Sequence, residues 1–507
     1  MTPTKQQADF ISAIRDTRDN LALVARAGCG KTSTILMAVN EIVKYEPRAE
    51  ICVCAYNTAI KDEVAEKLRK AGHTNWKTVN ASTIHGLGFG LVKFVFKIDA
   101  KTGVDDKKVY KLIEAKNSDT YRQYSLQIKQ LVGVAKQAGV GFFDDAPIGN
   151  ASVWYALADH FDINGLDDTS EMDAVVECAQ EIYRESLAQT NVIDFDDIIL
   201  FPLIKNLRVK FGKDYIILDE AQDASRARQA LARKFIKPNG RMFVVGDDRQ
   251  AIYGFSGADA AALPNLIAAL NAKVMPLSVT WRCPKAVVKV AQRYVSDIEA
   301  ADAAPEGLVS NVTITDKESE IELFNTMVAG DAILCRNTAP LITTAYKLIR
   351  MGKAIKVEGR EIGNGIKAII GRWKVTTIDA LLNRLEDYRN REVQKMMAKG
   401  NEAKVDEVND RCDTIVEICN ACLQNGKKNV TDVIEFIDNL FADGDKACII
   451  LATYHRSKGR EWKNVFLWEH STRCPSKAAR QEWQIKQEAN LAYVAVTRAM
   501  QTLTYIN

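Results

Sequence analysis

The sequence contains no apolar run that approaches the ~20 residues of a membrane-spanning helix. The opening residues, MTPTKQQADF, have neither a basic start nor an apolar segment, so we expect no secretory signal there. Internal repeats and low-complexity tracts are also missing, and no heptad pattern persists far enough for a coiled coil. These absences exclude fibrous and membrane classes and favour a globular protein of the cytoplasm.

Neither sign of charge dominates the chain. It has 68 basic and 65 acidic residues, a net charge of +3, which neither requires nor excludes a polyanionic partner. A nucleic-acid path could still be basic locally.

The cysteines do not suggest a disulfide framework. There are 11, an odd number spread along 507 residues, as in proteins with reduced thiols. Cys419 and Cys422 form a CxxC pattern near Cys412, which could suggest a metal or redox site. However, Cys412, Ile415 and Cys419 follow helical spacing and no fourth ligand is close, so we interpret these sulfurs as part of a core.

The length suggests about three or four domains, at ~100–200 residues each. Apolar runs typical of buried parallel strands lie at 21–25, 51–56, 215–219, 241–247 and 273–277, and again at 332–336, 447–454 and 464–468. Residues 91–190 and about 365–440 show helical patterns instead. We predict an α/β fold with two cores. The first comprises 1–90 and 191–278 with a helical insertion at 91–190; the second comprises 279–360 and 443–507 with a short helical insertion at 361–442.

LALVARAGCGKTST, residues 21–34, has the order strand, glycine loop and helix start that is typical of a P-loop. Glycines let the backbone curl around phosphates at a helix N-terminus. Lys31 would reach the β and γ phosphates, and the Thr32 hydroxyl would bind magnesium. Ala25 stands where the pattern has its first glycine. The residues expected to bind ATP here are Gly28, Cys29, Gly30, Lys31, Thr32 and Ser33.

YIILDEAQD, residues 215–223, carries a buried strand directly into clustered carboxylates. Asp219 would hold the magnesium ion, and Glu220 would orient and deprotonate the attacking water. Such charges are tolerable where a strand ends at a cation and water rather than in a dry core. An acidic turn is the alternative, but the P-loop upstream makes it the weaker one.

Together these segments resemble the motifs of superfamily 1A DNA helicases of the UvrD/Rep/PcrA type, whose P-loop usually has alanine at the Ala25 position. The resemblance covers nearly the whole chain outside the two insertions. It implies two RecA-like P-loop NTPase cores, parallel sheets flanked by helices, each with a mainly helical inserted subdomain. It also implies ATP and Mg²⁺ as cofactors.

The resemblance assigns further nucleotide contacts. TPTKQQADF makes Gln6 the adenine reader, since an amide can donate and accept at once. In VVGDDRQAIYGFSGAD, Gln250 senses the γ-phosphate. In PLSVTWRCP, Trp281 stacks on adenine and Arg282 is an arginine finger.

The last two motifs complete the nucleotide site that the resemblance implies. LATYHRSKGREW places Glu461 near the nucleotide sugar, with Gly459 in a tight turn. QEANLAYVAVTRAM supplies Arg498 as a second finger and Tyr493 as a packing or coupling residue. The implied catalytic set is Asp219, Glu220, Gln250, Arg282 and Arg498.

The same resemblance implies contacts with single-stranded DNA. NASTIHGLG provides Thr83 and His85, and the segment after Gln250 provides two aromatic rings for base stacking. One of these rings could instead belong to the core. Ser256 stands where the family often has arginine. The residues expected to face DNA are Thr83, His85, Tyr253, Phe255, Thr453 and His455.

The implied activity is ATP-dependent movement on single-stranded DNA, 3′→5′, with separation of duplex strands by a monomer acting at single-strand junctions. Glu488, Asn490 and the AYNTAIKDEV segment are similar to the F-box helicase subgroup, although no F-box is evident. The short insertion at 361–442 leaves the extent of unwinding open. Two alternatives remain: a translocase that strips proteins from single strands, and a P-loop ATPase that acts on RNA or a protein partner.

Overall fold

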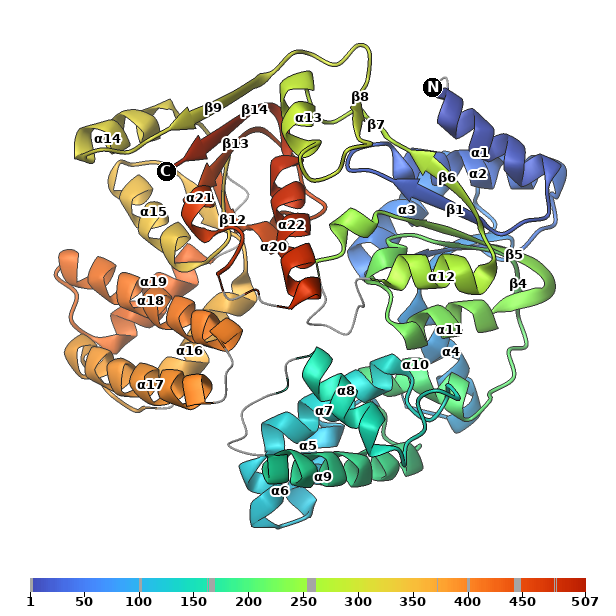
Figure 1. Ribbon diagram of the computed structural model, residues 1–507, viewed down its shortest axis with the longest axis horizontal. Coiled ribbons are helices and arrows are strands. Elements are labelled where there is room, and N and C mark those ends of the chain that lie inside the picture. The colour runs from blue at the N-terminus through green and yellow to red at the C-terminus, as the bar shows by residue number, and fades with distance from the viewer. Residues whose placement is uncertain are drawn as a thin grey trace. The chain divides into compact units, whose positions relative to one another are not determined.

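The computed structural model describes residues 3–99, 103–161, 163, 169–252, 261–371, 373–398, 402–441, 448–477, 479 and 481–507. The chain divides into two compact units, Met1–Ser278 and Val279–Asn507. The predicted α/β class with parallel sheets is confirmed in both of them. Helices and strands carry the labels of Figure 1.

The core of the first unit is a six-stranded parallel sheet of order β3-β2-β4-β5-β1-β6. Its strands are β1 (Leu21–Ala25), β2 (Ile51–Ala55), β3 (Val79–Thr83), β4 (Lys213–Leu218), β5 (Ile236–Gly246) and β6 (Lys273–Leu277). Strands β1 and β2 are short and strongly apolar, as expected for a sheet that is buried on both faces.

Helices cover both faces of this sheet (Figure 1). On one face lie α1 (Lys5–Asp16), α2 (Lys31–Tyr45) and α3 (Thr58–Lys70). On the other lie α4 (Ile84–Phe96), α10 (Phe195–Ile204), α11 (Arg226–Lys234) and α12 (Ala262–Leu270). Helix α4 runs continuously across residue 90, where the sequence suggested the first core would give way to its insertion.

The helical part of the first unit has its own core, which includes Leu131, Trp154 and Tyr183. Its helices are α5 (Lys108–Ala115), α6 (Asp119–Gln123), α7 (Ser125–Ala138), α8 (Ala151–His160) and α9 (Thr169–Ala188).

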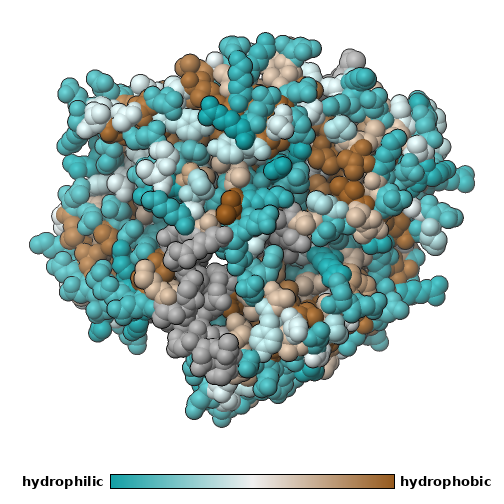
Figure 2. Space-filling view, viewed as in Figure 1, coloured by the Kyte–Doolittle hydropathy of each residue, from teal (hydrophilic) through white to brown (hydrophobic). Residues whose placement is uncertain are grey.

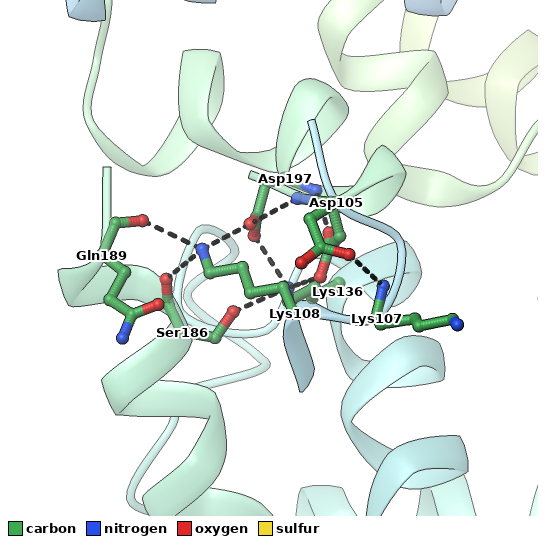
Figure 3. Close-up of polar contacts among 8 residues, drawn as sticks. Asp105, Lys107, Lys108, Lys136, Ser186, Gln189 and Asp197 are labelled. Carbon is green, nitrogen blue, oxygen red and sulfur yellow. Dashed lines mark hydrogen bonds and ion pairs between the residues drawn. The ribbon is translucent and has the colours of Figure 1, made fainter. Parts of the chain in front are cut away.

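A buried ion cluster ties this helical part to α10 (Figure 3). The Lys108 Nζ lies 2.7 Å from an Asp197 oxygen and also donates to the backbone carbonyls of Ser186 and Gln189. The Lys136 Nζ lies 2.8 Å from the other Asp197 oxygen. All three charged side chains are at most 1% exposed. Because buried charges are tolerable only when paired, the cluster fixes α5 and α7 against the start of α10.

The second unit repeats the design with a sheet of order β11-β12-β10-β13-β14-β9. Its strands are β9 (Leu308–Val312), β10 (Ala332–Cys335), β11 (Ile355–Val357), β12 (Ile449–Thr453), β13 (Trp462–Trp468) and β14 (Ala499–Ile506). The accompanying helices are α13 (Lys285–Ala291), α14 (Lys317–Thr326), α15 (Ala339–Arg350), α20 (Tyr454–Ser457), α21 (His470–Arg473) and α22 (Glu482–Val496). A small pair, β7 (Val279–Thr280) and β8 (Glu299–Ala300), precedes them.

In the described part of the chain between β11 and β12 lie the helices α16 (Arg360–Gly371), α17 (Ile378–Ala398), α18 (Glu402–Gln424) and α19 (Val430–Leu440). Cys412, Cys419 and Cys422 lie on α18 with fully buried side chains in an apolar core, which confirms their interpretation as core residues. Asp410 of α18 accepts hydrogen bonds of 3.0 Å from the backbone N–H groups of Thr338 and Ala339 and so caps α15.

The surface has the character of a globular protein. Figure 2 shows a mainly hydrophilic face on which apolar residues form separate groups. Among the described residues, no helix combines the length and apolar character that crossing a bilayer requires.

Candidate nucleotide and nucleic-acid sites

The predicted P-loop connects β1 to α2 at the carboxyl edge of the first sheet. Gly28 and Gly30 have φ values of 73° and 82°, a left-handed conformation that favours glycine. Cys29 is buried between them. Gly30 has no side chain to cap α2, so the first-turn N–H groups remain available to an anion. Lys31, Thr32 and Ser33 occupy that turn and are partly exposed.

Asp219 and Glu220 follow β4 and meet the P-loop lysine. The Lys31 Nζ lies 2.6 Å from the Glu220 Oε1. Burial, with the nearby Glu220 charge, raises the pKa of Asp219 to about 6. Burial alone would lower the pKa of Lys31, but the charges of Glu220 and Asp219 outweigh it and raise this pKa. The buried carboxylate of Asp219 and the partly buried carboxylate of Glu220 beside a single lysine form a site with excess negative charge, which suits a divalent cation.

Glu220 is held in an unusual backbone conformation. Its φ of 50° lies in the left-handed region, which is uncommon for a residue with a side chain. Its backbone N–H donates to Asp219 Oδ1 at 2.9 Å, and its carboxylate accepts from the Gln222 amide. These contacts fix the carboxylate that is expected to act on water.

Gln250 belongs to the same site through Asp247. The Gln250 amide donates to Asp247 Oδ2 at 2.7 Å, and the other Asp247 oxygen lies 2.9 Å from an Arg26 nitrogen. Gln222 accepts from the Asp247 backbone N–H at 3.0 Å. Sequence reasoning missed Arg26 and Asp247. Their signal was a cation inside the glycine loop and a second acidic pair in GDDRQ.

Gln6 lies beside the residues that precede Trp281 in the sequence. Its amide donates to the Ser278 hydroxyl and accepts from the Ser278 backbone N–H, both at 2.9 Å. The neighbouring Gln7, which sequence reasoning passed over, donates to Thr34 of α2 at 3.0 Å. Gln7 also approaches Gly30, since a Cβ atom there would lie 3.5 Å from its Nε2. The Gln7 amide therefore stands close to the P-loop, whereas the Gln6 amide is held by Ser278.

The Thr-x-His motif of the first unit joins the carboxylate site. Thr83 ends β3 and caps α4, with its hydroxyl accepting from the Gly86 N–H at 2.9 Å. His85 lines one small pocket with Asp219 and Glu220. Burial, with the charge of Arg228, lowers the pKa of His85 to about 4, so this ring is neutral at pH 7.

The second unit contains the same local design. Thr453 ends β12 and caps α20, and His455 follows two residues later. Burial, with the positive charges of Arg336 and Lys458, lowers the pKa of His455 to about 3. Both motif threonines therefore have a structural role as helix caps, and both histidines are neutral.

Arg282 and Glu461 come together in the second unit. The Arg282 Nε lies 2.5 Å from Glu461 Oε2, and another of its nitrogens lies 3.5 Å from the Thr497 carbonyl oxygen. Trp281, next to Arg282, is 62% exposed. An exposed ring of this size is available for stacking.

Arg498 lies within electrostatic reach of Arg282 but is almost fully buried. Its hydrogen bonds go to neutral oxygens: the carbonyls of Val494 and Arg460 and the Thr497 hydroxyl. Burial, with the charge of Arg282, lowers the pKa of Arg498 to about 9. The guanidinium groups of Arg282 and Arg498 have Glu461 as their nearby carboxylate, so positive charge remains there. A phosphate group would neutralise this charge.

Another pair in this unit was not expected from the sequence. Arg336, which follows β10, binds both oxygens of the buried Glu488 on α22 at 2.7–3.1 Å. Tyr493 of the same helix is fully buried, which fits its expected packing role. Tyr253, Phe255 and Ser256 lie outside the described residues.

Comparison with known protein families agrees with this geometry. The UvrD/REP helicase N-terminal domain matches residues 4–270, and the UvrD-like helicase C-terminal domain matches residues 198–507. The chain therefore belongs to the UvrD/Rep helicase family, and the resemblance inferred from its motifs is confirmed.

Curated relatives are distant in sequence. The F-box DNA helicase protein 1 of Schizosaccharomyces pombe is 25% identical over 99% of this chain and 57% of its own length. The ATP-dependent DNA helicase Rep of Buchnera aphidicola from Acyrthosiphon pisum is 23% identical over 77% of this chain and 56% of its own length. Rep of Escherichia coli is 23% identical, over 59% and 43% respectively. The chain thus spans about half the length of the relatives it matches.

Proposed function

We propose that this protein is an ATP-dependent DNA helicase or translocase that hydrolyses ATP with Mg²⁺ and moves on single-stranded DNA. The observation that carries the proposal is the shared pocket of His85, Asp219 and Glu220. It brings the predicted DNA motif against the carboxylates predicted to hydrolyse ATP. An ATPase without a nucleic-acid track has no need of that juxtaposition.

The residues of the first unit fit a magnesium nucleotide. Lys31 would donate to the β and γ phosphates, and Thr32 and Asp219 would hold the ion. A bound Mg²⁺ would withdraw charge from the phosphates. Glu220, released from Lys31 when phosphates take that lysine, would accept the proton of the attacking water. Gln250, whose amide is oriented by Asp247, would sense the presence of the γ-phosphate.

The second unit would stabilise the transition state. Arg282 and Arg498 would act as fingers on the γ-phosphate, Glu461 would contact the sugar and Trp281 would stack on adenine, with Gln6 reading that base. Arg282 would exchange its contact with Glu461 for phosphate. Such fingers contribute ~10³–10⁵ in rate in nucleotide hydrolases.

The track would be single-stranded DNA, contacted by Thr83, His85, Thr453 and His455, with Tyr253 and Phe255 as stacking rings. We propose 3′→5′ movement by a monomer that loads at duplex junctions, with the helical regions 91–190 and 361–442 acting as insertions of two motor cores. Neutral histidines suit this role, because they can hydrogen-bond to a strand without fixing a phosphate permanently.

Strand displacement tests the proposal. Duplexes with a 3′ or a 5′ single-stranded tail are incubated with ATP and Mg²⁺, beside Lys31→Ala as the inactive control. Separation of the 3′-tailed duplex alone supports a 3′→5′ helicase. Removal of streptavidin from a biotinylated single strand without duplex separation would identify a stripping translocase. Activity on RNA strands alone would contradict the DNA assignment.

A further inference from the structure

The first unit has a surface that combines basic side chains with exposed aromatic rings, away from the motif-bearing edge. Three segments without any Asp or Glu meet there: α4, the 205–212 connection from α10 to β4, and α11. Lys210 links the first two, since its Nζ lies 4.4 Å from the centre of the Phe94 ring. Lys234 links the last two, donating to Asn206 at 3.0 Å. Figure 1 shows α4, α10 and α11 on one side of the sheet.

This surface combines positive charge with exposed aromatic rings. Phe211 is 80% exposed and Phe94 is 63% exposed. Lys205, Arg208 and Lys210 are exposed, and no carboxylate in the described part of the chain pairs with them. Burial lowers the pKa of Lys234, as expected for a cation without a carboxylate neighbour. We call this surface the basic patch: Phe94, Lys205, Arg208, Lys210, Phe211 and Lys234.

The basic patch is separate from the ATP and DNA motifs. Asp219 follows the carboxyl end of β4, whereas Phe211 precedes its start at Lys213. The strand between them covers about 17 Å at ~3.3 Å per residue. Likewise, Thr83 caps the start of α4 and Phe94 lies near its end, about 17 Å further along at ~1.5 Å per residue. The patch therefore lies at the opposite edge of the sheet.

We propose that the basic patch is a second binding site for single-stranded nucleic acid, with cations on the phosphates and bases stacked on Phe211 and Phe94. Rings interleaved with lysine and arginine are how proteins hold unpaired strands without sequence preference. Duplex DNA would offer phosphates but no free bases for these rings. This inference goes beyond the proposed function, because strand binding here requires neither ATP nor the motor motifs.

Strands of two lengths distinguish binding at the basic patch from binding at the motor motifs. A fluorescent strand of about 10 nucleotides is short enough for one site, and one of about 40 can reach both. The test variants are Arg208→Gln with Lys210→Gln, and Phe211→Ala. The matched control is Lys44→Gln with Tyr45→Ala, because Lys44 lies 5.0 Å from the centre of the half-exposed Tyr45 ring elsewhere on this unit.

We expect both test variants to bind the long strand about tenfold more weakly, with short-strand binding unchanged. The double glutamine variant should also lower the slope of log Kd against log salt by about 1.4, at ~0.7 per lost phosphate contact. The proposal would be overturned if these variants kept the wild-type affinity for the long strand and the wild-type slope of log Kd against log salt. The proposal would also be overturned if these variants lost binding to vesicles of phosphatidylcholine and phosphatidylserine but still bound the strand as the wild type does.

ATP turnover in the presence of the short strand is measured as a separate test of the proposed motor. If the short strand leaves the ATP turnover of the wild-type protein unchanged, the proposed motor is refuted. The dependence of strand binding on strand length and on salt still tests the basic patch.

Discussion

Replacing Asp219 by Asn should stabilise the protein in the absence of nucleotide and divalent cations. Burial, with the charge of Glu220, raises the pKa of this carboxyl from 3.8 to about 6. At about 1.4 kcal/mol per pH unit, the ionised carboxylate costs the folded state about 3 kcal/mol at pH 7. Asparagine keeps the shape and an acceptor oxygen for the Glu220 N–H but removes the charge.

The sign of the effect fixes its pH dependence. A carboxyl whose folded pKa is raised binds its proton more tightly in the folded state, so stability falls as pH rises from about 4 to about 6. The Asn variant should therefore equal wild type near pH 4 and exceed it by up to about 3 kcal/mol above pH 6. Urea unfolding at several pH values, in EDTA, measures this difference. An Asn variant no more stable than wild type at pH 7 would refute the electrostatic account of the site.

Other substitutions test other parts of the structure. Lys136→Met should lower the free energy of unfolding by about 3–5 kcal/mol in urea titrations, because it leaves the carboxylates of Asp194 and Asp197 with Lys108 as their one buried cation. A change below about 1 kcal/mol would contradict the cluster's role. Arg282→Ala should reduce ATP turnover by about 10³-fold or more, with nucleotide binding retained. A reduction under about tenfold would contradict the proposed role of Arg282 as an arginine finger. Trp281→Ala should raise the KM for ATP more than it lowers kcat, as steady-state kinetics would show, and a change in kcat alone would argue against adenine stacking.

The parts of the site that lie close together in sequence were predictable. The P-loop and the DEAQD segment each place their residues within a few positions after an apolar strand, so type and spacing alone reveal them. Strands β1, β2 and β4 were likewise visible as apolar runs. The parallel sheet then brings the ends of these strands to one edge, which is why local motifs assemble into one site.

Contacts between distant residues were not predictable. Lys108 and Asp197 are 89 positions apart, and Arg26 and Asp247 are 221 apart. Strand β3, with sequence VNAST, and β14, with sequence AMQTLTYI, were also missed, because polar residues interrupt their apolar character. Strand β5 begins before Lys-Pro-Asn-Gly, a stretch that typically indicates a turn. In each case pairing with neighbouring strands determines the structure more than local preference does.

The measurement that tests the central claim most directly is ATP turnover with and without single-stranded DNA, for wild type and Glu220→Gln. We expect strong stimulation by DNA in wild type and none in the variant, with nucleotide binding retained, because Glu220 is the group that we propose accepts the proton of water. Brisk turnover that is indifferent to DNA, or full activity in Glu220→Gln, would contradict the assignment of this chain as a DNA-coupled motor.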